Sequence, residues 1–149
     1  MDENEEARGT RTSDEAFRFV FRVRYADTDQ MGMAYYGNYL RWFEVGRAEM
    51  LRARGMSYRE VEAAGIRLPV VEARCRYVRP ARYDDLLVIA TRLARLGRAT
   101  VRFEYEVRRE GEDDLLAEGM TEHCFLDAAG RPVRAPAFLV ELMTGARRG

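Results

Sequence analysis

The chain has 149 residues, of which 47% are hydrophobic and 34% are charged, and its 25 basic and 25 acidic residues cancel to a formal net charge of zero. This length and composition predict one globular domain, and the zero net charge argues against nucleic acid as a partner. The longest uninterrupted aliphatic run, residues 86–90, is too short to span a bilayer, so we expect no membrane insertion.

The N-terminal segment is acidic and polar and lacks the apolar region that a signal peptide needs. We therefore expect a disordered tail over residues 1–14, a single domain over residues 15–149 and a cytoplasmic location. Residues 17–25 then alternate between apolar and mostly arginine side chains. This alternation predicts a strand with one apolar face.

Residues 38–55 follow helical spacing, with an apolar stripe on one side. Asn38 suits the N-cap position, and Gly55 suits the position just after the helix end. A glycine inside a helix, as at Gly46, costs about 1 kcal/mol relative to alanine. A close approach of this helix to a sheet would explain that glycine.

A short second helix is predicted from Ser57, where Glu60 stands in the capping-box position. After Ile66 the pattern changes to alternating strands joined mainly by short turns, and a terminal helix follows at about residues 136–143. This order, without any βαβ rhythm, predicts an α+β fold in which an antiparallel sheet packs on the long helix. Apolar surface left uncovered by that packing predicts a dimer or a larger assembly.

The cysteine and histidine residues do not form the spacing of a metal-binding motif. Two cysteines, Cys75 and Cys124, lie far apart, and the single histidine, His123, stands in an alternating strand. We expect His123 to be an ordinary core or surface residue, and we expect neither a metal nor a cofactor.

One stretch has a more specific pattern: "RVRYADTDQMGMAYYGNYLRWFEVGRAEML", from Arg22 to Leu51. A strand, then T-D-x-x-G, then Y-x-x-x-Y, then an aromatic and acidic helix resembles the 4-hydroxybenzoyl-CoA thioesterase family and its Tol-Pal-associated acyl-CoA thioesterase relatives. The later stretch "VRPARYDDLLVIATRL" gives weaker support. The resemblance implies the hot-dog fold, an antiparallel sheet wrapped around one long helix. It also implies homodimers joined through sheet edges, often within homotetramers, with active sites between protomers.

The same resemblance implies site residues. Asp29 falls at the position of the family's catalytic carboxylate, where it would act as general base on a water or as nucleophile. Gly32 matches the glycine of the same loop. Tyr36 falls where the Tol-Pal-associated branch often has histidine and the hydroxybenzoyl branch an aromatic residue. Because a helix start offers free N–H groups, the backbone N–H of Tyr36, or that of Gly37, is the expected oxyanion donor.

Other residues near this loop are assigned supporting parts. Asp27 is interpreted as a loop residue that supports the site without taking part in the chemistry. Met31 and Met33 either line an acyl channel or pack the loop. The aromatic residues are expected in the core or in the acyl pocket: Tyr35, Tyr39, Trp42 and Phe43. Arg98 and Arg134 are the candidates for binding the phosphates of coenzyme A.

Three functions remain open at this point. The first is an acyl-CoA thioesterase, the second is a thioesterase that acts on acyl carrier protein, and the third is a non-catalytic acyl-CoA-binding protein of the same fold. A dehydratase of this fold would resemble D-x-N-x-x-H, which the chain lacks.

Overall fold

A computed structural model describes residues 16–144, and the predicted tail over residues 1–14 lies outside this part of the chain. The elements are strand β1 (Phe17–Arg22), 3-10 helix η1 (Tyr25–Asp27), helices α2 (Asn38–Ala53) and α3 (Tyr58–Ala63), strands β2 (Val70–Tyr77), β3 (Leu86–Leu96), β4 (Thr100–Arg109) and β5 (Leu115–Cys124), and helix α4 (Ala137–Thr144). Within residues 16–144, no helix has the length and apolar character needed to cross a membrane.

The five strands form one antiparallel sheet in the order β1-β3-β4-β5-β2, so β1 and β2 are its edges. Alternate residues of β4 are buried, as the sequence pattern predicts: Val101, Phe103, Tyr105 and Val107. The predicted antiparallel α+β fold is therefore confirmed. The first strand is shorter than the predicted 17–25, because the chain leaves β1 at Arg22 and turns into η1.

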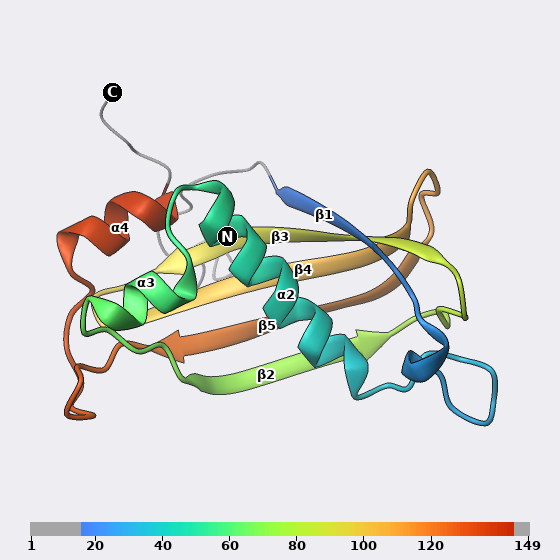
Figure 1. The fold of residues 1–149 in the computed structure, drawn as a ribbon, viewed down its shortest axis with the longest axis horizontal. Coiled ribbons are helices and arrows are strands. Elements are labelled where there is room, and N and C mark those ends of the chain that lie inside the picture. The colour runs from blue at the N-terminus through green and yellow to red at the C-terminus, as the bar shows by residue number, and fades with distance from the viewer. Residues whose placement is uncertain (1–15, 145–149) are drawn as a thin grey trace, which may run out of the picture.

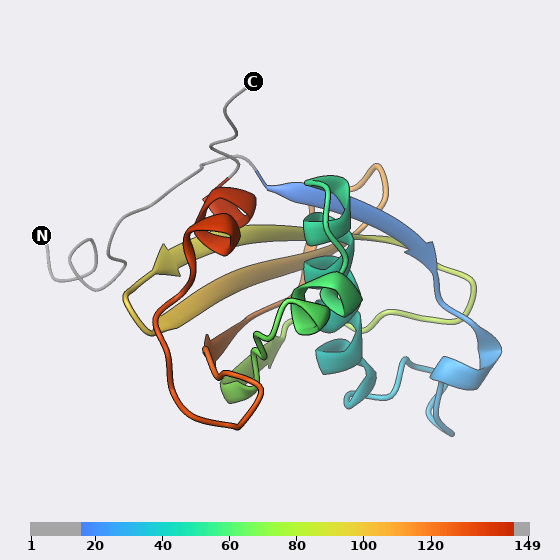
Figure 2. The same cartoon turned by 60° about the vertical axis from the view of Figure 1, so that its left-hand side comes forward.

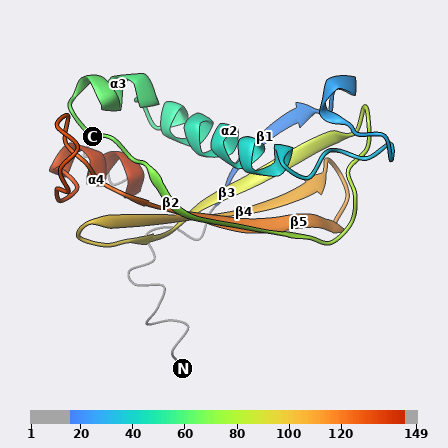
Figure 3. The same ribbon diagram turned by 90° about the horizontal axis from the view of Figure 1, so that it is seen from below.

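Helix α2 lies across one face of the sheet, which gives the molecule two layers (Figures 1 and 3). Gly46 brings the helix close to β3, because a Cβ atom there would lie 2.6 Å from Thr91 Oγ1 and 3.0 Å from Ile89 Cγ2. The predicted close approach is confirmed. Gly55 follows the helix end with φ 115°, also as predicted.

The start of α2 differs from the prediction by one residue. Gly37 is the N-cap, and Asn38 is the first helical residue. The Asn38 amide does not cap the helix; its Nδ2 donates to the backbone carbonyl of Asp27 at 2.8 Å. The predicted capping box of Ser57 and Glu60 is present at the start of α3.

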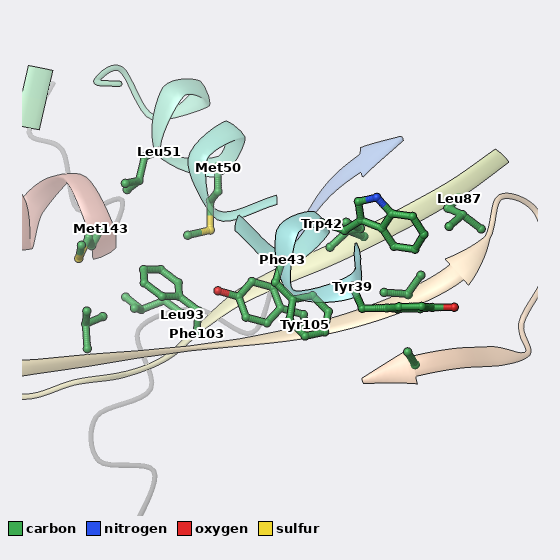
Figure 4. Close-up of a cluster of buried hydrophobic side chains, with 14 of the residues drawn as sticks. Tyr39, Trp42, Phe43, Met50, Leu51, Leu87, Leu93, Phe103, Tyr105 and Met143 are labelled. Carbon is green, nitrogen blue, oxygen red and sulfur yellow. The ribbon is translucent and has the colours of Figure 1, made fainter. Parts of the chain in front are cut away.

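The core lies between α2 and the central strands (Figure 4). The rings of Phe43 and Tyr105 stack with centroids 4.4 Å apart and planes within 3°. Gly119 of β5 makes room for this stack, since a Cβ atom there would lie 2.6 Å from the Phe43 ring and 2.2 Å from the backbone oxygen of Arg74. Both cysteines are free thiols.

Strand β2 is the most exposed strand of the sheet, although it carries apolar residues. Most of its side chains are exposed, among them those of Val70, Val71 and Tyr77. It pairs only with β5, so its outer backbone groups have no strand partner within the described chain.

The two ends of the sheet carry different segments. The segment between β1 and α2 lies at one end, together with the end of β2 and the start of β3, whereas the β3–β4 turn and α4 lie at the other (Figures 1 and 2). β3 has 11 residues, so these ends are roughly 33 Å apart at about 3.3 Å per residue.

Candidate active site

The segment between β1 and α2 is a tightly bonded loop. The Asp29 N–H donates to the Met33 carbonyl at 2.9 Å, and the Gly32 N–H donates to the Asp29 carbonyl at 3.0 Å. The Ala34 N–H donates to the Ala81 carbonyl at 2.8 Å, which ties the loop to the chain before β3. Gly32 has φ 77°, a conformation that favours glycine. The backbone conformation alone therefore accounts for a glycine at this position, independently of any contact with a substrate.

The two aspartates of this loop have opposite surroundings. Asp27 is only 3% exposed, and its Oδ1 lies 3.0 Å from Nη2 of both Arg24 and Arg41. Burial by itself would raise the pKa of Asp27, but the hydrogen bonds from Arg24 and Arg41 outweigh it and lower the pKa below its usual value. Asp27 thus joins the loop to α2, and its carboxylate is fully occupied with structural partners.

The Asp29 carboxylate is more open. Its Oδ1 accepts a hydrogen bond from the Met31 N–H at 2.9 Å, which orients the side chain within the loop. Its Oδ2 forms no hydrogen bond with residues 16–144. One oxygen is therefore fixed by the protein, and the other remains available to a water or a substrate.

The start of α2 supplies unpaired donors near this carboxylate. The N–H groups of Tyr35 and Asn38 donate to the carbonyls of Asp27 and Tyr35, respectively, and that of Tyr39 donates to the carbonyl of Tyr36. The N–H groups of Tyr36 and Gly37 have no acceptor within the described chain, and no side chain caps the helix. Free N–H groups and the positive end of the helix dipole therefore coincide here.

Asp29 and Tyr36 line the same hollow, whose volume is about 270 Å³. Its wall is mostly apolar and aromatic: Met31, Met33, Ala34, Tyr39, Tyr77, Val78, Arg79 and Pro80 complete it. Met31, Met33 and Tyr39 therefore line the hollow beside Asp29. Trp42 and Phe43 lie in the core instead, and Tyr35 packs its ring against Tyr36.

A second hollow has a volume of about 530 Å³. It shares Asp29 with the first and is lined also by Tyr25, Thr28, Gln30, Gly32 and Tyr83. Asp29 therefore borders both hollows, of which the first is more apolar and the second more polar.

The predicted phosphate-binding arginines are not brought to this site within one chain. Arg98 lies in the β3–β4 turn, and its carbonyl accepts from the Ala135 N–H, which places Arg134 at the same end of the sheet. That end is opposite the one that carries the segment between β1 and α2, to which Asp29 belongs (Figure 1).

Tyr77 is a residue of this hollow that sequence reasoning missed. It stands at the end of the edge strand β2, 48 positions after Asp29, in an alternation that any strand would show. Its hydroxyl donates to the backbone carbonyl of Tyr36 at 2.9 Å. No local signal could have found it, because the contact exists only in the folded chain.

A buried polar chain crosses the core away from the hollow. Arg47 donates to the hydroxyls of Tyr58 and Tyr105 at 2.7 and 3.1 Å, and Thr121 Oγ1 lies 2.5 Å from the Tyr105 hydroxyl and 2.9 Å from His123 Nε2. His123 is thus a core residue with partners on both ring nitrogens, the second being the Leu68 carbonyl. Burial, assisted by the charge of Arg47, lowers the pKa of His123 to about 4.

Acid is expected to destabilise the fold through this histidine. Unfolded histidine titrates near 6.5 and the folded one near 4, so the unfolded chain binds more protons between these values. The free energy of unfolding should then decrease as pH falls through this window, by at most about 1.4 kcal/mol per pH unit. Chemical denaturation across this range checks the slope, and a His123→Gln variant with the same slope would contradict it.

Comparisons with known proteins give a consistent result. The family model described as the thioesterase-like superfamily matches residues 23–143. A putative esterase of Aquifex aeolicus is 34% identical over 127 residues, which cover 85% of this chain and 97% of that protein. The acyl-CoA thioester hydrolase YbgC of Escherichia coli is 33% identical over 102 residues, which cover 68% of this chain and 75% of that protein.

Solved structures agree with this result. A hypothetical protein from Thermus thermophilus has a TM-score of 0.80 at 36% identity, covering 90% of this chain and 100% of its own. A DHNA-CoA thioesterase from Staphylococcus aureus has a TM-score of 0.81 at 28% identity, covering 88% of this chain and 90% of its own.

Proposed function

Because this chain belongs to the thioesterase-like superfamily, we propose that it hydrolyses acyl-CoA thioesters with Asp29 and the amide end of helix α2. Family membership confirms the predicted hot-dog fold and the predicted class of enzyme, a thioester hydrolase. One observation supports the choice of residues. A carboxylate with a free oxygen and a tyrosine with an unpaired backbone N–H line the same apolar hollow.

The chemistry needs an attacking group and a stabilised oxyanion. Asp29 either removes a proton from a water that attacks the thioester carbon or attacks that carbon directly, forming a mixed anhydride that water then hydrolyses. In both routes the carbonyl oxygen becomes an oxyanion, which the Tyr36 N–H, with Gly37 beside it, would bind. The C–S bond then breaks, and the coenzyme A sulfur leaves as a thiolate that takes a proton from solvent.

The two hollows suit the two arms of a thioester. The scissile carbon joins an acyl group to the sulfur of a pantetheine chain, and Asp29 lines both an apolar hollow and a more polar one. We assign the acyl group to the hollow of Tyr36 and Tyr39 and the pantetheine chain to the hollow of Gln30 and Gly32.

A panel of acyl-CoA substrates, from aromatic to long-chain, tests the proposed activity through release of free thiol. Hydrolysis of at least one substrate is expected. Hydrolysis of acyl carrier protein thioesters alone would move the assignment to that partner. Binding of acyl-CoA without hydrolysis of any thioester would favour the non-catalytic protein.

We also propose that the chain functions as a homodimer joined along β2. The unpaired backbone edge and the exposed apolar residues of β2 support this, since such an edge readily pairs with another strand. An antiparallel pairing would place the far end of one sheet beside the Asp29 loop of the other. Arg98 and Arg134 would then serve the phosphates bound at the site of the second copy.

Charge complementarity predicts the register of this pairing. If Ala73 lies on the two-fold axis, Glu72 of each copy stands opposite Arg74 of the other, and opposite charges across a strand pair are favourable. If Arg74 lies on the axis, two like charges meet.

Cross-linking tests this register. In a Cys75→Ser background, Ala73→Cys is expected to form a disulfide-linked dimer under mild oxidation, because directly opposed residues lie about 5 Å apart. The matched variant Arg74→Cys should remain largely monomeric on non-reducing gels. The reverse result would place the axis at Arg74, and no cross-link from either variant would contradict both registers.

A further inference from the structure

Tyr77 connects the edge strand β2 to the turn that precedes α2. Its ring packs perpendicular to the Tyr39 ring with centroids 5.0 Å apart, and it meets the Tyr36 ring at 6.2 Å and 85°. These contacts hold the ring although the residue is 45% exposed. The hydroxyl is thereby directed to the Tyr36 carbonyl oxygen, at 2.9 Å.

This carbonyl belongs to the same peptide unit as the N–H of Gly37. It accepts a second hydrogen bond, from the Tyr39 N–H at 3.2 Å. Two donors on one carbonyl draw electron density from the peptide unit, which makes its N–H a stronger donor. They also fix the plane of this peptide, and with it the direction of the Gly37 N–H.

We propose that Tyr77 is a positioning residue that holds and polarises the Gly37 N–H, one of the two proposed oxyanion donors at the start of α2. This inference rests on the proposed function, because it assigns Tyr77 a part in the same reaction. Tyr77 itself need not touch the reacting atoms. It acts through the Tyr36–Gly37 peptide, whose single N–H, that of Gly37, has no acceptor within the described chain.

The hydroxyl remains a donor throughout the working pH range. Partial burial, together with the neighbouring Cys75 thiol, raises the pKa of Tyr77 well above that of free tyrosine. Ionisation would turn the donor into an acceptor that repels the carbonyl, so a raised pKa favours the arrangement.

Tyr77→Phe removes the hydroxyl and keeps the ring contacts. We expect kcat to fall about tenfold and KM to change by less than about twofold, since the oxyanion exists only in the transition state. Tyr58→Phe is the matched control, because the Tyr58 hydroxyl also forms a hydrogen bond, with Arg47 Nε at 2.7 Å, but belongs to the buried polar chain away from the hollow. Its kcat should stay at the wild-type value.

A second measurement separates positioning from simple structural support. Replacing Tyr77 with 3-fluorotyrosine and then 3,5-difluorotyrosine makes the hydroxyl a progressively stronger donor. We expect kcat to rise in that order, whereas a hydroxyl that only stabilises the fold would leave kcat flat. This series also decides the matter if Tyr77→Phe weakens the dimer or the fold.

The failures of the two proposals are distinguishable. If Asp29→Asn abolishes turnover but Tyr77→Phe and the fluorinated series leave kcat unchanged, the part assigned to Tyr77 is wrong and the proposed function stands. If wild-type protein hydrolyses no thioester, the proposed function fails first and the inference about Tyr77 fails with it.

Discussion

Asp29→Asn is expected to lower kcat for thioester hydrolysis by roughly two or more orders of magnitude. Asparagine keeps the shape of the side chain and can still accept the hydrogen bond from the Met31 N–H, so the loop should keep its conformation. It is neither a base nor a nucleophile of comparable strength, so both routes open to the carboxylate are lost. A loss of this size corresponds to about 2.7 kcal/mol of transition-state stabilisation.

Steady-state kinetics on the best substrate of the panel measures this loss, and thermal unfolding shows whether the fold is kept. The melting temperature should stay within about 1–2 °C of wild type, because the substituted oxygen, Oδ2, has no partner among the described residues. Wild-type turnover in Asp29→Asn would remove this residue from the mechanism.

Asp27→Asn should lower the stability of the fold, whereas Asp29→Asn should lower kcat. This carboxylate is buried and paired with Arg24 and Arg41, so its neutralisation leaves two guanidinium groups facing an amide. We expect the free energy of unfolding to fall by about 2 kcal/mol. This is a small loss for removal of one partner from a buried ion pair, because both arginines reach solvent. For a chain of this size the melting temperature would fall by about 6 °C.

The pH dependence of this loss provides its control. The folded-state pKa of Asp27 is lower than its ordinary value. The ionised carboxylate therefore makes its full contribution to the free energy of unfolding above the ordinary aspartate pKa, and this contribution is lost as pH falls through the lowered pKa. The stability difference between wild type and Asp27→Asn should therefore shrink in acid. An unchanged melting temperature at pH 7, or a loss of turnover as large as that of Asp29→Asn, would contradict the separation of roles.

Local pattern was sufficient to predict most of the elements and the α+β class, whereas the hot-dog fold was predicted from the resemblance. The alternation in β4, the helical stripe of α2 and the capping box of α3 are short-range signals, and each corresponds to an observed element. Gly46 pointed to a close helix–sheet contact because a glycine in a helix needs a packing reason. The prediction of Asn38 as the N-cap was wrong by one residue. Its side chain donates instead to the Asp27 carbonyl, which only tertiary folding brings near.

The candidate site was predictable only in part. Asp29, Gly32 and Tyr36 fall in one contiguous motif, so the resemblance identified them together. Tyr77 contributes through a contact between positions 41 residues apart, and nothing in the alternation of β2 separates it from an ordinary strand tyrosine. Arg98 and Arg134 lie at the end of the sheet opposite the loop between β1 and α2, so the phosphate binding predicted for them depends on a second copy of the chain.

A crystal structure of Asp29→Asn with an unhydrolysed acyl-CoA bound tests the central claim most directly. We predict the thioester carbonyl oxygen about 3 Å from the N–H nitrogen of Tyr36 or Gly37, with the substituted side chain at position 29 about 3–3.5 Å from the carbonyl carbon. A thioester bound with its carbonyl away from the start of α2, or out of reach of position 29, would contradict the account.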